Sequence, residues 1–250
     1  MNRRNLLAAG VAALALSVSF APVRAEDPIK IGLVLPLTGP FTSTGKEIVA
    51  AAELYNKANG ASVAGRKVEL VIKDDGGVPD TTKRLAQELI VTDHVTALAG
   101  FGLTPLALAT APIATQGQTP MVVMLAATSI ITERSPFIVR ASQVVPQIAG
   151  PFGTWAYKDG MKKIVTIVSD YGPGHDVEKW FSQTFKEAGG VVENMRVPLQ
   201  NPDFSPFLQR AADAKPDAVL AFVPAGVGAL FMKQFVERGL DKSGIRLIAT

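Results

Sequence analysis

Residues 29–47 read IKIGLVLPLTGPFTSTGKE, an apolar run that passes into a loop rich in glycine, proline and hydroxyl side chains. Residues 49–60, VAAAELYNKANG, follow with a helical pattern. A strand, a glycine-bounded loop and a helix suggest a phosphate-binding loop, which requires G-x-x-x-x-G-K-[ST]. Gly39 and Gly45 are instead separated by five residues, and the residue after Lys46 is an acid. The loop therefore does not have the spacing of a nucleotide site.

The rest of the chain alternates short β-branched runs with longer helical patterns. Strands are expected at residues 30–35, 67–73, 95–99, 121–125, 164–169, 191–197, 218–223 and 246–249, and helices at 47–59, 81–92, 106–116, 176–188, 204–212 and 228–238. Such alternation indicates βαβ units around parallel sheets. A second strand, Gly/Pro-rich loop and helix begin in KKIVTIVSDYGPGHDVE, residues 162–178. The sequence therefore predicts two doubly wound α/β lobes, at residues 26–141 and 142–250.

Residues 1–25 form a separate segment, in which Arg3 and Arg4 precede an apolar stretch that runs to Phe20. Basic, apolar and small residues in that order predict a secretory signal peptide, cleaved after Ala25. The apolar stretch is shorter than the roughly 20 residues that a membrane-spanning helix needs. We therefore expect an exported protein that resides in the periplasm.

Charge and cysteine content exclude several classes of protein. Three of the 25 Lys and Arg residues lie in the predicted signal peptide, so the remaining chain has 22 residues of each sign and is formally neutral. This balance does not favour a nucleic-acid partner, which would require a basic surface. The chain has no cysteine, which excludes disulfides, a thiol nucleophile and a lipidated N-terminal cysteine.

Four predicted loops lie at the carboxyl ends of strands, which is the edge at which parallel α/β sheets bind ligands. They cover residues 41–45, 101–104, 126–128 and 170–174. Hydroxyl groups and backbone amides dominate these loops, and Asp170 is their only charged residue. Backbone N–H groups and helix N-termini can hold a small anion without a paired Lys or Arg. The sequence therefore predicts a site for a small organic carboxylate.

Five segments occur in a recognisable order along the chain. They are IKIGLVLPLTGPFTSTGKE (29–47), VELVIKDDGGVPDTTKRLAQELI (68–90), AGFGLTPLALATAPIATQGQTPMVV (99–123), AATSIIT (126–132) and SDYGPG (169–174). Together they resemble the solute-binding proteins of ABC importers, of the branched-chain amino acid (Leu/Ile/Val-binding) type. The resemblance implies the periplasmic binding protein type I fold, with two lobes and a ligand cleft at their hinge. It also implies further residues beyond Thr250 and delivery of the ligand to a membrane ABC permease.

The resemblance further implies roles for individual residues. Thr128 is expected to hold the ligand carboxylate through its amide and hydroxyl, and the Ala126 carbonyl to accept from an amine or hydroxyl. Tyr171 is expected to cover the ligand, although it could simply pack on its own loop. For Thr104, spacing alone favours a helix cap, whereas the resemblance favours contact with the anion. The expected ligand-binding residues are Phe41, Thr44, Phe101, Gly102, Leu103, Thr104, Ala126, Ala127, Thr128, Tyr171, Pro224 and Ala225.

The chemistry of the ligand stays open between an amino acid and an amine-free acid. Amino-acid binders of the resembled family tend to carry an aromatic residue at the position of Thr44, and the acid that pairs with the ligand ammonium would lie after residue 250. Phe41, Phe101 and Leu103 would tolerate a flat apolar body. An aromatic carboxylate is therefore a strong alternative to leucine, isoleucine or valine.

Enzymatic functions find little support in the motifs. His175 adjoins Asp176 and could suggest a metal or acid–base site, but one histidine with loop carboxylates is a weak ligand set. The pair at 74–75 precedes two glycines, which predicts a turn capped by carboxylates rather than a metal site. No G-x-S-x-G elbow occurs. We therefore expect a binding protein with no catalytic residue, cofactor or metal; the alternative is a ligand-sensing module of a receptor system with the same fold.

Overall fold

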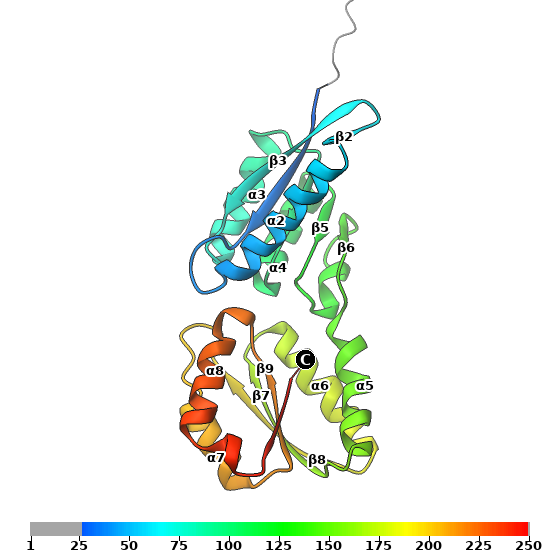
Figure 1. The fold of residues 1–250 in the computed structure, drawn as a ribbon. Coiled ribbons are helices and arrows are strands. Elements are labelled where there is room, and N and C mark those ends of the chain that lie inside the picture. The colour runs from blue at the N-terminus through cyan, green and yellow to red at the C-terminus, as the bar shows by residue number, and fades with distance from the viewer. Residues whose placement is uncertain (1–26, 250) are drawn as a thin grey trace, which may run out of the picture.

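The computed structural model describes residues 27–249, and these residues form two α/β lobes, each built around its own sheet (Figure 1). The predicted signal peptide, residues 1–25, lies outside the described residues. The first lobe contains strands β1 to β6 and the second contains strands β7 to β10. The predicted fold class is confirmed, and we keep the boundary between residues 141 and 142 as the proposed division of the lobes.

The first lobe is a six-stranded sheet with the order β2-β3-β1-β4-β5-β6, in which only β2 and β3 are antiparallel. The strands are β1 (Ile29–Leu35), β2 (Ser62–Val63), β3 (Arg66–Asp74), β4 (Ala97–Gly100), β5 (Met121–Val123) and β6 (Ile138–Arg140). The helices are α2 (Thr42–Ala58), α3 (Pro79–Val91), α4 (Thr104–Gln116) and the 3-10 helix η1 (Ser129–Glu133). Alternate residues of β1 face opposite sides, so Val34 packs with α3 and α4 while Leu33 packs with α2.

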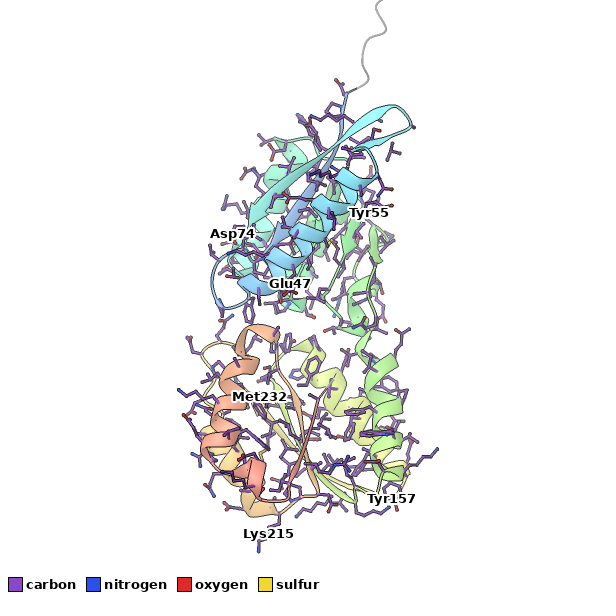
Figure 2. All side chains as sticks on the ribbon, viewed as in Figure 1. Glu47, Tyr55, Asp74, Tyr157, Lys215 and Met232 are labelled. Atoms are coloured by element: carbon purple, nitrogen blue, oxygen red, sulfur yellow. The ribbon has the colours of Figure 1, made fainter. Side chains whose placement is uncertain are left out.

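The second lobe is a four-stranded parallel sheet with the order β10-β9-β7-β8. The strands are β7 (Lys163–Ser169), β8 (Val191–Val197), β9 (Ala218–Phe222) and β10 (Arg246–Ala249). The helices are α5 (Val145–Lys158), α6 (Gly172–Glu187), α7 (Ser205–Ala214), α8 (Ala225–Glu237) and the 3-10 helix η2 (Leu240–Lys242). Helices α5 and α6 cover one face and α7 and α8 the other, with Phe181 and Phe231 in the respective cores (Figure 1). Tyr157 and Lys215 lie at the end of this lobe that faces away from the first lobe (Figure 2).

Helix α5 is a long element that the sequence pattern does not predict. Prolines at the start of the helix and at Pro151 disguise its period, because proline usually ends a helix. The buried side of α5 consists largely of small residues, among them Ala149, Gly150 and Gly153. These residues let α5 pack closely on α6, where the Thr184 hydroxyl donates to the Gly150 carbonyl at 2.7 Å. Close packing between helices thus stabilises a segment of poor intrinsic helical character.

Three helices begin at least three residues earlier than predicted, at Thr42, Gly172 and Ala225 rather than at residues 47, 176 and 228. The glycines that suggested loops lie instead in first helical turns. A Cβ at Gly45 would overlap the Pro36 carbonyl, which follows strand β1. In the second lobe, a Cβ on the glycine at position 174 would overlap the Ser169 carbonyl in the same way. Glycine is therefore required in the first turns of α2 and α6, where these helices start against the ends of their preceding strands.

The loop after β1 is held by the carboxylate of Asp74. One Asp74 oxygen accepts hydrogen bonds from the backbone N–H groups of Leu37, Thr38 and Gly76, at 2.8, 3.2 and 2.9 Å. Asp75 accepts from the Gly77 N–H at 2.8 Å, so residues 74–77 form the carboxylate-capped turn that the sequence predicts. Partial burial raises the pKa of Asp74, whereas these hydrogen bonds, together with one from the Thr38 hydroxyl, lower it. The hydrogen bonds outweigh burial, so the net pKa is below the ordinary value.

Replacement of Asp74 by Asn should lower the free energy of unfolding by about 1–2 kcal/mol at pH 7, since an amide oxygen accepts N–H groups less strongly than a carboxylate. Because folding depresses the pKa of Asp74, its stabilisation is present above the unfolded pKa and is lost as the pH falls through the folded value. Urea denaturation should therefore show a difference between wild type and variant at pH 7 that shrinks as the pH falls below about 4, the ordinary pKa of an aspartate. Glu53→Gln, on the exposed side of α2, is the control. A difference independent of pH would contradict this role.

Candidate functional site

A cavity of about 270 Å³ lies between the two lobes. Both lobes contribute to its walls, through the loops that follow strands β1, β4, β5, β7 and β9. Ten of the twelve predicted ligand-binding residues line it. They are Phe41, Thr44, Gly102, Leu103, Thr104, Ala126, Ala127, Tyr171, Pro224 and Ala225.

The position of the cavity follows from the strand order. In the first sheet, β3 and β4 lie on opposite sides of β1, and in the second sheet, β8 and β9 lie on opposite sides of β7. The loops after the central strands therefore diverge and leave a crevice at the carboxyl ends, which is where open α/β sheets bind ligands. Both crevices face the same space, because the carboxyl ends of the two sheets point toward each other (Figure 1).

Among the described residues, none that lines the cavity is charged. The cavity instead receives the N-terminal ends of five helices, α2, α4, α5, α6 and α8, which contribute residues such as Thr44, Thr104, Val145, Pro173 and Ala225. The first turn of each helix has N–H groups without an intrahelical partner, and the helix dipole makes this end positive. The arrangement therefore favours a small anion in an otherwise apolar space.

Aromatic side chains form the apolar part of the wall. Tyr171 and Phe222 stack with ring centroids 6.4 Å apart and an interplanar angle of 25°. Phe41 and Leu103 belong to a buried apolar cluster, and Tyr171 packs against this cluster. Burial raises the pKa of Tyr171, so its phenol stays protonated and can donate a hydrogen bond. The site thus offers room and contacts for a flat ring.

Two predicted site residues do not line the cavity. Phe101 is fully buried in the core of the first lobe, where a left-handed backbone conformation (φ 64°) turns its side chain away from the site. Its role as a ligand contact stays a prediction that this position does not favour, because the hydrophobic core holds the ring. Thr128 is only 6% exposed and lies behind the cavity wall. Its role as a carboxylate ligand therefore stays a prediction that the position of the side chain does not favour.

The hydroxyls of Thr104 and Thr128 form a hydrogen bond with each other at 2.7 Å. Helix α4 has its N-cap at Leu103 and no side-chain cap hydrogen bond, so the expectation that Thr104 caps the helix was wrong. Pairing of the two hydroxyls satisfies both buried side chains without a ligand. It also joins the start of α4 to the segment 126–129.

Arg140, at the end of β6, was not predicted to support the site. Its Nη1 donates to the Ala126 carbonyl and its Nη2 donates to the Thr128 carbonyl at 2.6 Å. The Ala126 carbonyl, which we expected to accept from the ligand, is thus already engaged by a protein donor. Burial lowers the pKa of Arg140 and the nearby Asp176 carboxylate raises it, with a net pKa below the ordinary value. The sequence offered one signal, an arginine that directly follows the apolar run FIV.

Further cavity residues come from elements that the sequence pattern did not reveal. Gln143 lies in the connection between the lobes, and Val145 and Ile148 lie at the start of α5. They were missed because α5 itself was missed. Leu125, Pro173, Phe222 and Val223 complete the wall. Gln143 adds the only side-chain amide to the lining, and it is exposed at the hinge side of the cavity.

Two other groups of polar residues lie outside the cavity, and neither has the features of a metal or ligand site. His175 contacts Asp170 at 2.6 Å (Nε2 to Oδ1), and both side chains are largely exposed. Within residues 27–249 no group of three or more His, Cys, Asp or Glu side chains gathers as a metal site would require. A larger, open hollow of about 630 Å³ includes Lys215 and Asp217 at the opposite end of the second lobe. It lies at the amino ends of the strands, where parallel sheets do not present ligand-binding loops.

Comparison with known proteins agrees with this geometry. The family model described as periplasmic binding protein matches residues 28–250. The chain therefore belongs to the periplasmic binding protein family, whose members are solute-binding receptors of ABC transporters rather than enzymes. Within the described part of the chain, no helix is long and apolar enough to cross a membrane.

The relatives of this chain are associated with two classes of ligand, branched-chain amino acids and hydroxybenzoic acids. The Leu/Ile/Val-binding protein homolog 6 of Brucella melitensis biotype 1 is 44% identical over 252 residues, which cover 100% of this chain and 63% of the relative. A solute-binding protein from Rhodopseudomonas palustris BisB5, in complex with 3,4-dihydroxybenzoic acid, is 57% identical, with a TM-score of 0.86 over 89% of this chain and 61% of its own. A solute-binding protein from R. palustris HaA2, in complex with p-hydroxybenzoic acid, is 42% identical, with the same TM-score over 90% of this chain and 62% of its own. The chain thus spans slightly less than two thirds of these relatives.

Replacement of Arg140 by Lys should lower the free energy of unfolding by about 2 kcal/mol, because one ammonium cannot serve both carbonyls in the geometry of a guanidinium. Urea denaturation of the ligand-free protein measures this loss. Arg134→Lys makes the same exchange at an exposed position and is the matched control. If both variants unfold at the same urea concentration, Arg140 does not support the segment 126–128.

Proposed function

We propose that this protein is the periplasmic receptor of an ABC importer and that it binds a small aromatic carboxylate of the hydroxybenzoate class. The observation that carries the proposal is the cavity between the lobes, which combines aromatic walls, helix N-termini and no charged side chain among the described residues. The carboxylate would be held by backbone N–H groups at the starts of α2 and α4. The ring would contact Phe41 and Tyr171, which both line the cavity.

The aromatic wall of the cavity and the solved relatives favour an aromatic acid over an aliphatic amino acid. The stacked pair of Tyr171 and Phe222 matches a flat ring better than a branched aliphatic chain. The solved structures with benzoate-type acids support the same choice, since one of them is 57% identical to this chain. The relative at 44% identity, named for leucine, isoleucine and valine, defines the competing ligand class.

Ligand binding would couple to hinge closure. The ligand contacts both lobes, so it stabilises the form in which they are close together, and the membrane permease would recognise that form. Transport requires the ligand to leave unchanged, and we propose no chemical step at this site. The proposed ligand contacts are the ten predicted residues that line the cavity, with Gln143 and Phe222 added.

Isothermal titration of the full-length gene product, with its signal peptide removed, tests the proposal. The ligands are 3,4-dihydroxybenzoate, 4-hydroxybenzoate, benzoate, leucine and valine. We expect micromolar or tighter binding of at least one hydroxybenzoate, about −8 kcal/mol or more favourable, and at least tenfold weaker binding of leucine and valine. Preferred binding of leucine or valine would overturn the aromatic assignment. Absence of binding to all five ligands would overturn the proposed function.

Replacement of Tyr171 by Ala should raise the dissociation constant of the best hydroxybenzoate by about 10- to 100-fold, because the ring loses one aromatic wall. Tyr171→Phe retains the wall and isolates the contribution of the phenol. Tyr55→Ala is the control, since Tyr55 is 72% exposed on α2 and lies outside the cavity (Figure 2). Titration of the three variants decides the point, and an unchanged affinity in Tyr171→Ala would remove this side chain from the site.

A further inference from the structure

The two lobes touch on both sides of the cavity, through residues that do not line it. On one side, the start of α6 lies against Thr128 and Ser129 of the first lobe. On the other side, Gly226 in the first turn of α8 lies against the Pro40 carbonyl in the loop after β1. Neither Ser129, Pro40 nor Gly226 is among the cavity residues. These two contacts therefore join the lobes independently of any ligand.

The contact at α6 is polar and directional. One oxygen of the Asp176 carboxylate accepts from the Ser129 backbone N–H at 2.9 Å and from the Ser129 hydroxyl at 3.2 Å. Asp176 belongs to the second lobe and Ser129 to the first, so both hydrogen bonds cross between the lobes. Arg140 reinforces the contact, because it holds the carbonyl of Thr128 and attracts the Asp176 carboxylate.

Close packing accompanies both contacts. A Cβ on Gly172 would lie 2.5 Å from Thr128 Oγ1 and 3.1 Å from Thr104 Cγ2. A Cβ on Gly226 would overlap the Pro40 carbonyl and lie 3.2 Å from a ring carbon of Phe41. At Gly226 the opposing atoms are backbone, which cannot give way as a flexible side chain can, and at Gly172 they belong to two buried threonine side chains. The lobes therefore reach this separation because the first turns of α6 and α8 contain glycine at these positions.

We propose that Asp176 and Gly226 set the stability of the closed form and thereby the affinity for every ligand, without contributing to ligand selectivity. The inference rests on the proposed ligand-binding function for its affinity readout, but not for its structural readout. Apparent affinity is the intrinsic affinity multiplied by the fraction of protein in the binding-competent form. A change that destabilises only the closed form must therefore weaken all ligands by one common factor. A change in the cavity wall would weaken different ligands by different factors.

Asp176→Ala tests the polar contact, and Glu178→Ala is its matched control. Glu178 lies on the same helix but pairs with Arg196 inside the second lobe, at 2.7 Å. Asp176→Ala should raise the dissociation constants of 3,4-dihydroxybenzoate and 4-hydroxybenzoate by about tenfold each, so that their ratio stays within twofold of the wild-type value. Glu178→Ala should leave both constants unchanged. A changed ratio, or equal effects of the two variants, would overturn the role of Asp176.

Gly226→Ala tests the steric contact, with Gly228→Ala as its control in the same helix. A Cβ at Gly228 meets no atom within 4 Å, so this substitution isolates the effect of alanine on helix α8. Gly226→Ala should raise both dissociation constants by at least tenfold and by the same factor. Gly228→Ala should bind as the wild type does. Wild-type affinity in Gly226→Ala would show that closure does not require this approach.

A ligand-free measurement separates this inference from the proposed function. Because the chain has no cysteine, Glu47→Cys and Met232→Cys can carry a fluorophore pair, with one label on each lobe (Figure 2). Energy transfer in the absence of ligand reports the separation of the lobes. Both Asp176→Ala and Gly226→Ala should lower the transfer efficiency relative to Glu178→Ala and Gly228→Ala. Unchanged efficiency in both test variants would overturn the inference, whether or not a hydroxybenzoate binds.

Discussion

The close approach of helix starts to strand ends is the constraint on which the rest of the structure depends. Gly45 brings the first turn of α2 against the Pro36 carbonyl, and the glycine at position 174 brings α6 against the Ser169 carbonyl. A side chain at either position would push the helix away from the sheet edge. The N-terminal N–H groups would then no longer converge on one cavity, and the field that favours an anion would weaken. A backbone packing requirement thus determines the electrostatics of the site.

The charges that support the site lie behind its walls rather than inside it. The Asp74 carboxylate binds backbone N–H groups of the loop after β1, and the Arg140 guanidinium binds carbonyl groups of the segment 126–128. Each side chain binds backbone groups of a segment that also contributes residues to the cavity wall, such as Phe41 and Ala126. A direct ion pair with the ligand would have to repay the desolvation of both charges. Oriented amides and helix dipoles cost no such reorganisation, which suits a receptor that must hold its ligand and later release it.

The fold and most of the residues that line the cavity could be predicted from the sequence, because both depend on local sequence patterns. Alternating apolar runs and helical stretches predict parallel sheets, and parallel sheets place their loops at one edge. Sequence patterns did not predict the features in which packing overrides local preference. Helix α5 contains prolines and a buried side of small residues, and it packs closely against α6. Phe101 sits next to cavity residues in sequence but turns into the core, and Arg140 is distant in sequence from the carbonyls it holds. No spacing rule reveals such tertiary contacts.

The residues that line the cavity differ from the residues that hold the two lobes together. Aromatic and hydroxyl side chains line the cavity, whereas Asp176, Ser129 and Gly226 lie outside it and contact the other lobe. A receptor built in this way can change its cavity wall to suit another ring substitution without rebuilding its closed form. The reverse also holds, because a single methyl group at position 226, which does not line the cavity, would oppose closure. In the proposed mechanism the affinity therefore has two physical origins, and contacts with the ligand account for only one of them.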